Sequence, residues 1–87
     1  MGKKIDNFLE ENGKLKQLPA RYSMKLLAYD YLAGKFENDV EYTEKEVNAI
    51  ISSWHTFGDY VTLRRGLIDS GRLMRTADGS KYWKSKK

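Results

Sequence analysis

His55 is the only histidine of the chain, and Asp59 follows it four residues later. An imidazole beside a carboxylate can act as a general base toward a hydroxyl or thiol nucleophile. The chain has no cysteine, and its sequence places no hydroxyl nucleophile to complete such a pair. We therefore expect His55 to be a hydrogen-bonded turn residue. No catalytic residue, metal site or cofactor is assigned, and no enzymatic activity is expected.

The basic side chains offer a second chemistry, because they gather in the last third of the chain. Residues 1–59 carry eight Lys/Arg and ten Asp/Glu, a net charge of −2, whereas residues 60–87 carry eight and two, a net charge of +6. Such an asymmetry is typical of a surface that meets phosphate groups. Four of these lysines lie in the last seven residues, so a flexible, solvated tail over residues 84–87 is the alternative explanation.

A helix is expected to position the first of these cations. Asp59 is a suitable N-cap, and Ser70-Gly71 a suitable end. At about 100° per residue, the side chains on the inner face are Tyr60, Leu63, Leu67 and Ile68. The side chains on the opposite, outward face are Thr62, Arg65, Gly66 and Asp69. Arg64 falls beside the apolar face, so we expect a structural cation paired with a carboxylate such as Glu46 or Asp59.

A β-hairpin is expected to position the remaining cations. After Gly71 the pattern of apolar residues changes from a period of about 3.6 to a period of about 2. This predicts strands over residues 72–76 and 80–83, joined by a two-residue Asp78-Gly79 turn. The pairs expected to lie opposite one another are Arg75 with Tyr82 and Met74 with Trp83. The first pair has the composition of a cation–π contact.

The preceding helix has the clearest start in the chain. Thr43-Glu44-Lys45-Glu46 fits a capping box, with Thr43 as the N-cap and Glu46 closing back on its amide. Apolar side chains then recur at helical spacing, at Val47, Ile50, Ile51 and Trp54. Setting a helix start is a sufficient role for Thr43, Glu46 and Asp59, so these residues are assigned structural roles. Tyr42-Thr43 is expected to add a short strand beside the hairpin.

The first third of the chain predicts three smaller features. A short helix carries Ile5, Phe8 and Leu9 and stops at Asn12-Gly13. Residues 14–18 alternate as an edge strand does. Pro19 then leads into a helix of about four turns that ends near Gly34. The side chains expected on its inner face are Ala20, Met24, Leu27, Ala28 and Tyr31.

Together these elements predict an α+β fold of the winged helix-turn-helix type. It has a three-helix core and a C-terminal β-hairpin wing, preceded by a short helix and an edge strand. Residues 1–87 are expected to form a single domain, because chains divide into domains only at greater length. No apolar run approaches the ~20 residues of a membrane span, and no signal-peptide stretch follows residues 1–4. We therefore expect a cytoplasmic protein without a membrane partner.

A set of spaced residues also carries a family resemblance. They are Gly13-Lys14-Leu15, Leu18-Pro19, Tyr42-Thr43-Glu44-Lys45-Glu46-Val47-Asn48, Asp59, Leu63-Arg64-Arg65, Gly71, Arg75, Gly79 and Tyr82-Trp83. In these the chain resembles a bacterial domain of unknown function, the family numbered 2087 among such domains. Members are often described as transcriptional regulators, so the resemblance implies a regulatory setting and no catalytic residues. Gly66 departs from the pattern, since a bulkier residue is more usual there.

The fold order and the charge pattern point to the same surface. In a winged helix the helix after Asp59 enters a major groove, and the wing touches the backbone or the minor groove. We expect a DNA-binding module of a bacterial transcriptional regulator that contacts double-stranded DNA mainly through its phosphates. The expected contacts are Thr62, Arg65, Arg75, Lys81 and Lys84. The alternative is a non-catalytic protein-interaction or regulatory domain, favoured by Asp69 and the acidic residues 37–46. For Arg75, Lys81 and Lys84 the alternative explanation is that these charges keep an edge hairpin from aggregating.

Overall fold

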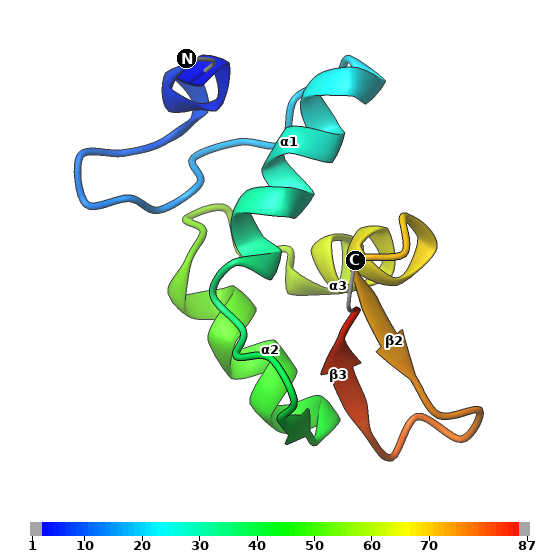
Figure 1. The fold of residues 1–87 in the computed structure, drawn as a ribbon. Helices are drawn as coiled ribbons and strands as arrows, with labels where there is room; N and C mark the ends of the chain where they lie inside the picture. Colours follow the sequence, from blue (N-terminus) through cyan, green and yellow to red (C-terminus); the bar gives the residue numbers. More distant parts are fainter. Residues whose placement is uncertain (1–2, 86–87) are drawn as a thin grey trace.

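The structure, a computed structural model, describes residues 3–85. The elements, in chain order, are the 3₁₀-helix η1 (Lys3–Phe8), α1 (Tyr22–Ala33), β1 (Glu41–Tyr42), α2 (Glu44–Ser53), α3 (Tyr60–Asp69), β2 (Leu73–Arg75) and β3 (Tyr82–Lys84). Over residues 3–85 the protein is thus a small α+β fold with three α-helices and one antiparallel sheet of three strands (Figure 1). This order is compatible with the expected winged helix.

The sheet has the strand order β1-β3-β2, so the hairpin strand β3 is central. The expected register is confirmed, with Arg75 opposite Tyr82 and Met74 opposite Trp83. A strand before α2 does pair with the hairpin, but it comprises Glu41 and Tyr42. The strand expected at Tyr42-Thr43 was placed one residue too late in the chain, because Thr43 is the N-cap of α2 and lies outside the strand.

The turn of the hairpin differs from the expected Asp78-Gly79 pair. The Gly79 N–H donates to the Thr76 carbonyl at 3.0 Å, and the Thr76 N–H donates to the Lys81 carbonyl at 3.0 Å. The Thr76 hydroxyl also accepts from the Ser80 and Lys81 amides. The loop therefore spans residues 77–80, because a threonine hydroxyl offers the backbone local partners that compete with strand pairing. Consequently β2 and β3 cover residues 73–75 and 82–84.

Two helix starts have the side-chain caps that were expected. The Thr43 N–H donates to Glu46 Oε1 at 2.9 Å, and the Glu46 N–H donates to Thr43 Oγ1 at 3.1 Å, which completes the capping box of α2. At α3 the Thr62 N–H donates to Asp59 Oδ1 at 3.3 Å. The helix caps predicted at Thr43, Glu46 and Asp59 are therefore present in the structure.

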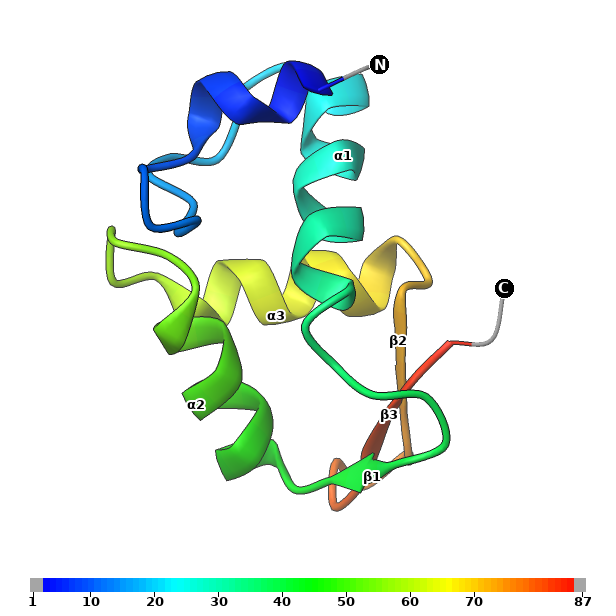
Figure 2. The ribbon, with the colours of Figure 1, turned by 60° about the vertical axis from the view of Figure 1, so that its left-hand side comes forward.

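Helix α1 packs against α3 and crosses it, as Figure 2 shows. Gly66 of α3 faces α1, and a Cβ atom added there would overlap the ring of Tyr29. The expectation that Gly66 points outward with Arg65 was therefore wrong. The missing side chain at this position makes room for a buried aromatic ring of the crossing helix.

The buried face of α1 is also not the expected one. The buried side chains of this helix are Ala28, Tyr29, Leu32 and Ala33. Of the expected face only Ala28 is buried, while Ala20 and Leu27 are exposed. The apolar side chains of α1 lie on every side of the helix, so their spacing alone does not predict which side is buried. The helix also begins later than expected, since Pro19 lies two residues before the N-cap Arg21.

Residues 14–18 do not form the expected edge strand. Leu15 instead makes isolated bridges with Leu9 and with His55. Its N–H donates to the Trp54 carbonyl at 2.8 Å, and its carbonyl accepts from the Thr56 N–H at 2.9 Å. Leu15 is fully buried, so this segment ties the N-terminal region to the end of α2.

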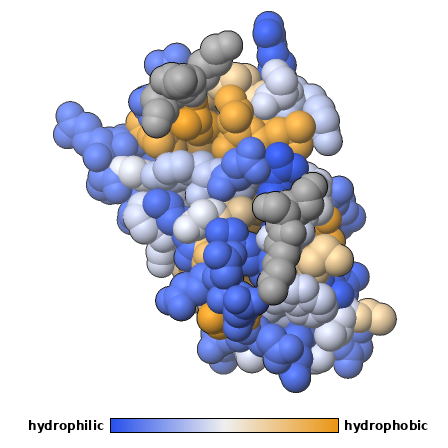
Figure 3. Space-filling model, viewed as in Figure 1, coloured by the Kyte–Doolittle hydropathy of each residue, from blue (hydrophilic) through white to orange (hydrophobic). Residues whose placement is uncertain are grey.

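The main core lies between the three helices and the sheet. Its buried apolar residues are Leu15, Ala28, Tyr29, Leu32, Ala33, Phe36, Val47, Ile51, Leu63, Leu67, Leu73 and Tyr82. On the face shown in Figure 3, apolar surface gathers over η1 and α1, and the surface below them is mostly hydrophilic. The cations considered next lie on α3 and the hairpin.

Candidate nucleic-acid interface

The outward face of α3 presents Thr62, Arg65 and Asp69, all of which are exposed. This face results from the burial of Leu63 and Leu67, which lie on the opposite side of the helix. Because Asp59 caps the first turn, the helix is fixed at its start. The expected outward position of Thr62 and Arg65 is what the structure shows.

Arg65 of α3 and Arg75 of β2 line the same surface depression, which has a volume of about 370 Å³. Arg64 lines it as well, and so do the carboxylates of Glu44 and Asp69. The depression thus brings together three guanidinium groups and two carboxylates from three elements. Guanidinium groups are suited to phosphate oxygens because they present several N–H donors in one plane.

Arg64 has a structural setting, but its partners are not the expected ones. Its Nη1 atom donates to Asn48 Oδ1 at 2.5 Å and lies 3.7 Å from Glu44 Oε2. The side chain is 18% exposed. The expected pairing with Glu46 or Asp59 was wrong, since both carboxylates are used as helix caps. Arg64 therefore joins α3 to α2 and leaves Arg65 as the freely exposed neighbour.

Arg75 is held by the hairpin loop. Its Nη1 atom donates to the carbonyls of Thr76 and Ala77 at 3.3 and 3.5 Å. The expected cation–π contact with Tyr82 is not among the ring contacts of residues 3–85, where Lys35 and Arg64 are the cations concerned. The guanidinium group instead donates to the loop carbonyls, and Arg75 is exposed at the edge of the depression.

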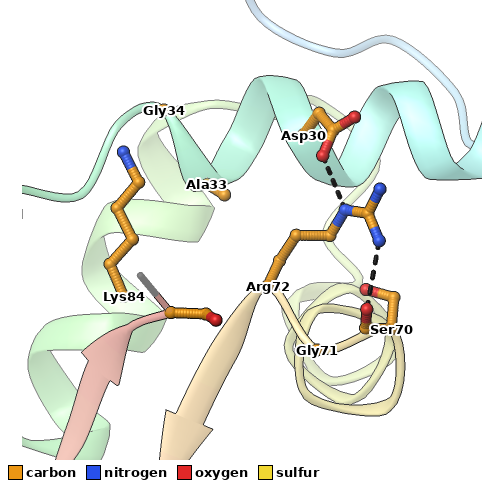
Figure 4. A pocket seen from close by; sticks show the side chains of 8 residues that line it. Asp30, Ala33, Gly34, Ser70, Gly71, Arg72 and Lys84 are labelled. Carbon is orange, nitrogen blue, oxygen red and sulfur yellow. Dashed lines mark hydrogen bonds and ion pairs between the residues drawn. The ribbon is translucent and has the colours of Figure 1, made fainter. Parts of the chain in front are cut away.

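Lys81 and Lys84 are in different surroundings from each other. Lys81 Nζ lies 3.3 Å from Glu41 Oε1, and both side chains are more than half exposed. Such an exposed pair is worth little, so Lys81 remains available at the hairpin. Lys84 lines another depression, beside Ala33 and Gly34 at the end of α1 (Figure 4). The structure therefore does not bring Lys84 together with Arg65 and Arg75.

Lys84 is also not part of a tail. It belongs to β3 opposite Leu73, and the N–H of Ser85 donates to the Arg72 carbonyl at 3.0 Å. The expected flexible tail over residues 84–87 was wrong at Lys84, because strand pairing holds it. Residues 86–87 lie outside the described part of the chain.

His55 is the hydrogen-bonded turn residue that was expected. It is 5% exposed. The Asp59 N–H donates to His55 Nε2 at 2.9 Å, so Nδ1 carries the proton and donates to the Ile51 carbonyl at 2.8 Å. Both ring nitrogens are occupied by backbone groups. The imidazole thus meets the backbone of Asp59 and not its carboxylate, which rules out the dyad.

Two titratable groups near α3 and the hairpin depart from their ordinary behaviour. Hydrogen bonds from the Ser80 N–H and the Thr76 hydroxyl lower the pKa of Asp78 to about 2. Burial raises the pKa of the Tyr29 phenol, and Asp69 and Tyr22 add to that effect. Asp78 thereby stabilises the loop that holds Arg75.

Two charged residues whose contacts join separate elements were not expected from the sequence. Glu44 lines the depression, approaches Arg64 and accepts from the Tyr82 hydroxyl at 3.5 Å. Arg72 joins the base of the hairpin to α1 through Asp30, 42 positions away, with Nε donating to Oδ1 at 2.6 Å. No local spacing indicates either contact, because both depend on how the sheet sits against the helices.

Within the described residues no group of three or more His, Cys, Asp or Glu side chains could hold a metal ion. None of the helices in that part of the chain is both long and apolar enough to cross a bilayer.

Comparisons with known proteins give one match. No curated protein and no solved structure matches the chain. A family model with the description "Uncharacterized protein conserved in bacteria (DUF2087)" matches residues 14–84. That range includes α1, the capping box, α3 and the whole hairpin. The chain therefore belongs to the DUF2087 family of bacterial proteins.

Proposed function

We propose that this chain is a DNA-binding winged-helix module of a bacterial transcriptional regulator acting in the cytoplasm. The observation that carries the proposal is that Arg65 and Arg75, from a helix and a strand, line one depression. Helix α3 is the element that enters the major groove in a winged helix, and the hairpin contacts the backbone beside it. Two guanidinium groups at the junction of these elements suit neighbouring phosphates.

The binding surface comprises Arg65 and Arg75, with Thr62 beside Arg65 and Lys81 on the hairpin. Lys84 is left out, because it faces the other depression. Asp69 and Glu44 limit the surface, since a carboxylate repels phosphate. We therefore propose shallow binding through phosphates, with weak discrimination between sequences.

The test is a salt titration of binding to a mixed-sequence duplex, followed by fluorescence anisotropy. The logarithm of the affinity should fall linearly with the logarithm of the salt concentration, with a slope near −0.9 for each phosphate contacted. Arg65→Ala and Arg75→Ala should each weaken binding for all sequences and reduce the slope by about 1.

Lys45→Ala provides the matched control, because Lys45 is an exposed cation on α2 outside both depressions. It removes the same charge and should leave the slope unchanged. Absence of binding even at low salt would refute the proposal, and so would equal losses in all three variants, which would indicate a diffuse charge effect.

A protein partner is the second candidate, and one observation favours it. The depression that contains the arginines also contains Glu44 and Asp69, a mixture of charges that is more usual for a protein surface than for a phosphate surface. Asp69→Asn distinguishes the two. It should strengthen duplex binding if α3 faces DNA, and should have no effect on the duplex if α3 faces a protein.

A further inference from the structure

Exposed apolar side chains gather at the start of α3. In the part of the chain that the structure describes, six large apolar side chains are exposed. Three of them, Phe57, Tyr60 and Val61, lie within five consecutive positions. Isolated exposed apolar residues are ordinary on a protein surface, whereas a group of neighbouring ones is typical of a contact surface. The first turn of α3 and the loop before it therefore form a candidate contact surface, and none of the three residues lines the arginine depression.

Val61 is the member of this group that is most available to a partner. The Phe57 ring packs edge-on against the ring of His55, with the two centroids 4.7 Å apart. The Tyr60 ring centroid lies 6.0 Å from the guanidinium carbon of Arg64. Val61 is the most exposed of the three, at 43%, and it is not one of the described residues that pack against the core. Its two methyl groups therefore lie on the surface of the helix.

Val61 and Arg65 share the outward face of α3. They are four positions apart, and side chains at this spacing are neighbours on a helix surface; both are exposed. Figure 2 shows the start of α3 at the end of the helix away from the hairpin base. Asp69 lies at the other end, about two turns from Val61, and Asp59 is occupied as the N-cap. The start of α3 thus combines an apolar contact with a neighbouring cation.

This pair of side chains suits the major groove of a duplex. A helix that enters the major groove contacts base edges with its N-terminal residues. Of the four bases of DNA, thymine presents a methyl group in this groove, and apolar side chains contact it. The valine side chain has no hydrogen-bond donor or acceptor, so it cannot recognise the polar edges of the other bases. The Arg65 guanidinium group beside it is suited to a phosphate.

We propose that the start of α3 selects thymine, through contact of Val61 with the thymine methyl group in the major groove. This inference rests on the proposed DNA binding and adds a base preference to the phosphate contacts of Arg65 and Arg75. The preference is about fourfold in affinity, because it depends on the burial of one methyl group. A preference of this size agrees with the weak discrimination between sequences proposed above.

The test compares two duplexes that differ only in this methyl group. One is a mixed-sequence duplex that contains thymine, and the other carries deoxyuridine at every thymine position. Binding of the full chain to each is followed by fluorescence anisotropy at the same low salt concentration. The unsubstituted chain should bind the thymine duplex about fourfold more tightly. Val61→Ala should reduce this ratio to less than about twofold, because the larger side chain is lost, and should leave the salt slope unchanged, because no charge is removed.

Leu27→Ala is the matched control, because Leu27 is an exposed apolar residue of α1. It should leave the ratio between the two duplexes unchanged, and so should Val61→Ile, which keeps a large apolar side chain at the same position. Val61 is exposed and alanine favours a helix, so Val61→Ala should fold, as circular dichroism checks.

The outcomes separate this inference from the proposed function. Equal affinities of the unsubstituted chain for the two duplexes would overturn thymine selection while leaving phosphate binding intact, and this is the result expected if the start of α3 meets a protein instead. An unchanged ratio in Val61→Ala would also overturn it, since the preference would then have another source. Absence of binding to either duplex at low salt would refute the proposed DNA binding and this inference with it.

Discussion

Gly66→Ala is the substitution for which local propensity and tertiary structure predict opposite results. Gly66 is in the middle of α3, and alanine stabilises a helix interior by about 0.5–1 kcal/mol relative to glycine. An added Cβ atom, however, would overlap two ring carbons and the hydroxyl oxygen of Tyr29. Tyr29 is 7% exposed, so its ring cannot turn away without losing buried contacts.

The magnitude follows from these two opposing effects. Overpacking a core costs about 1–3 kcal/mol, and the upper half of that range applies because a rigid ring must move as a whole. Subtracting the helix gain leaves a net destabilisation of about 1–2.5 kcal/mol. In a domain of this size each kcal/mol lowers Tm by about 4–8 °C, so Gly66→Ala should lower Tm by about 4–20 °C.

The assay is thermal and urea unfolding followed by circular dichroism, with two comparisons. Ala49→Gly, at an exposed position of α2, measures the propensity effect alone and should cost about 0.5–1 kcal/mol. In a Tyr29→Leu background, Gly66→Ala should be neutral or stabilising, because the overlapping ring is gone. A higher Tm for the single Gly66→Ala variant would refute the packing argument.

Three further predictions concern contacts that the structure defines. Arg64→Ala should lower the free energy of unfolding by about 1.5–3 kcal/mol, the worth of a hydrogen bond to a charged group, because Asn48 loses its donor; unchanged urea unfolding would contradict its structural role. Thr43→Ala should cost about 1 kcal/mol through loss of the N-cap, whereas Thr43→Ser should cost much less in the same assay. Asp78 has a folded pKa of about 2, below its ordinary value of 3.8. The ionised carboxylate therefore stabilises the folded state above about pH 4, and this stabilisation is lost as the pH falls from about 4 to about 2. Urea midpoints of Asp78→Asn and the unsubstituted chain should therefore differ near pH 5 and converge near pH 2; a constant difference would contradict the assignment.

The features that the sequence predicted correctly are those formed by near neighbours. The capping box of Thr43 and Glu46 and the cap by Asp59 each join residues three positions apart. The hairpin register, which pairs Arg75 with Tyr82, depends on one short loop. In such cases the geometry of a single turn brings the partners together, so residue types and spacing suffice.

The candidate surface was predicted only in part. The outward position of Arg65 followed from helical spacing, because Leu63 and Leu67 identify the buried face. The separation of Lys84 from Arg75 did not follow, although both are in the hairpin. Strand alternation states which residues share a face of the sheet, and it does not state which helix covers that face.

The tertiary structure decided the rest. Apolar residues surround α1, so only its crossing with α3 determined that Tyr29 is buried against Gly66. Arg64 meets Glu44 and Asn48 because α2 packs beside α3, and Arg72 reaches Asp30 across 42 residues. By itself the sequence determined the three α-helices, the caps of α2 and α3 and the hairpin register, since these depend on local bonds. The pairing of charged side chains depended on long-range packing. Many tertiary arrangements are compatible with the same local sequence pattern, and only the packing of the complete core selects one of them.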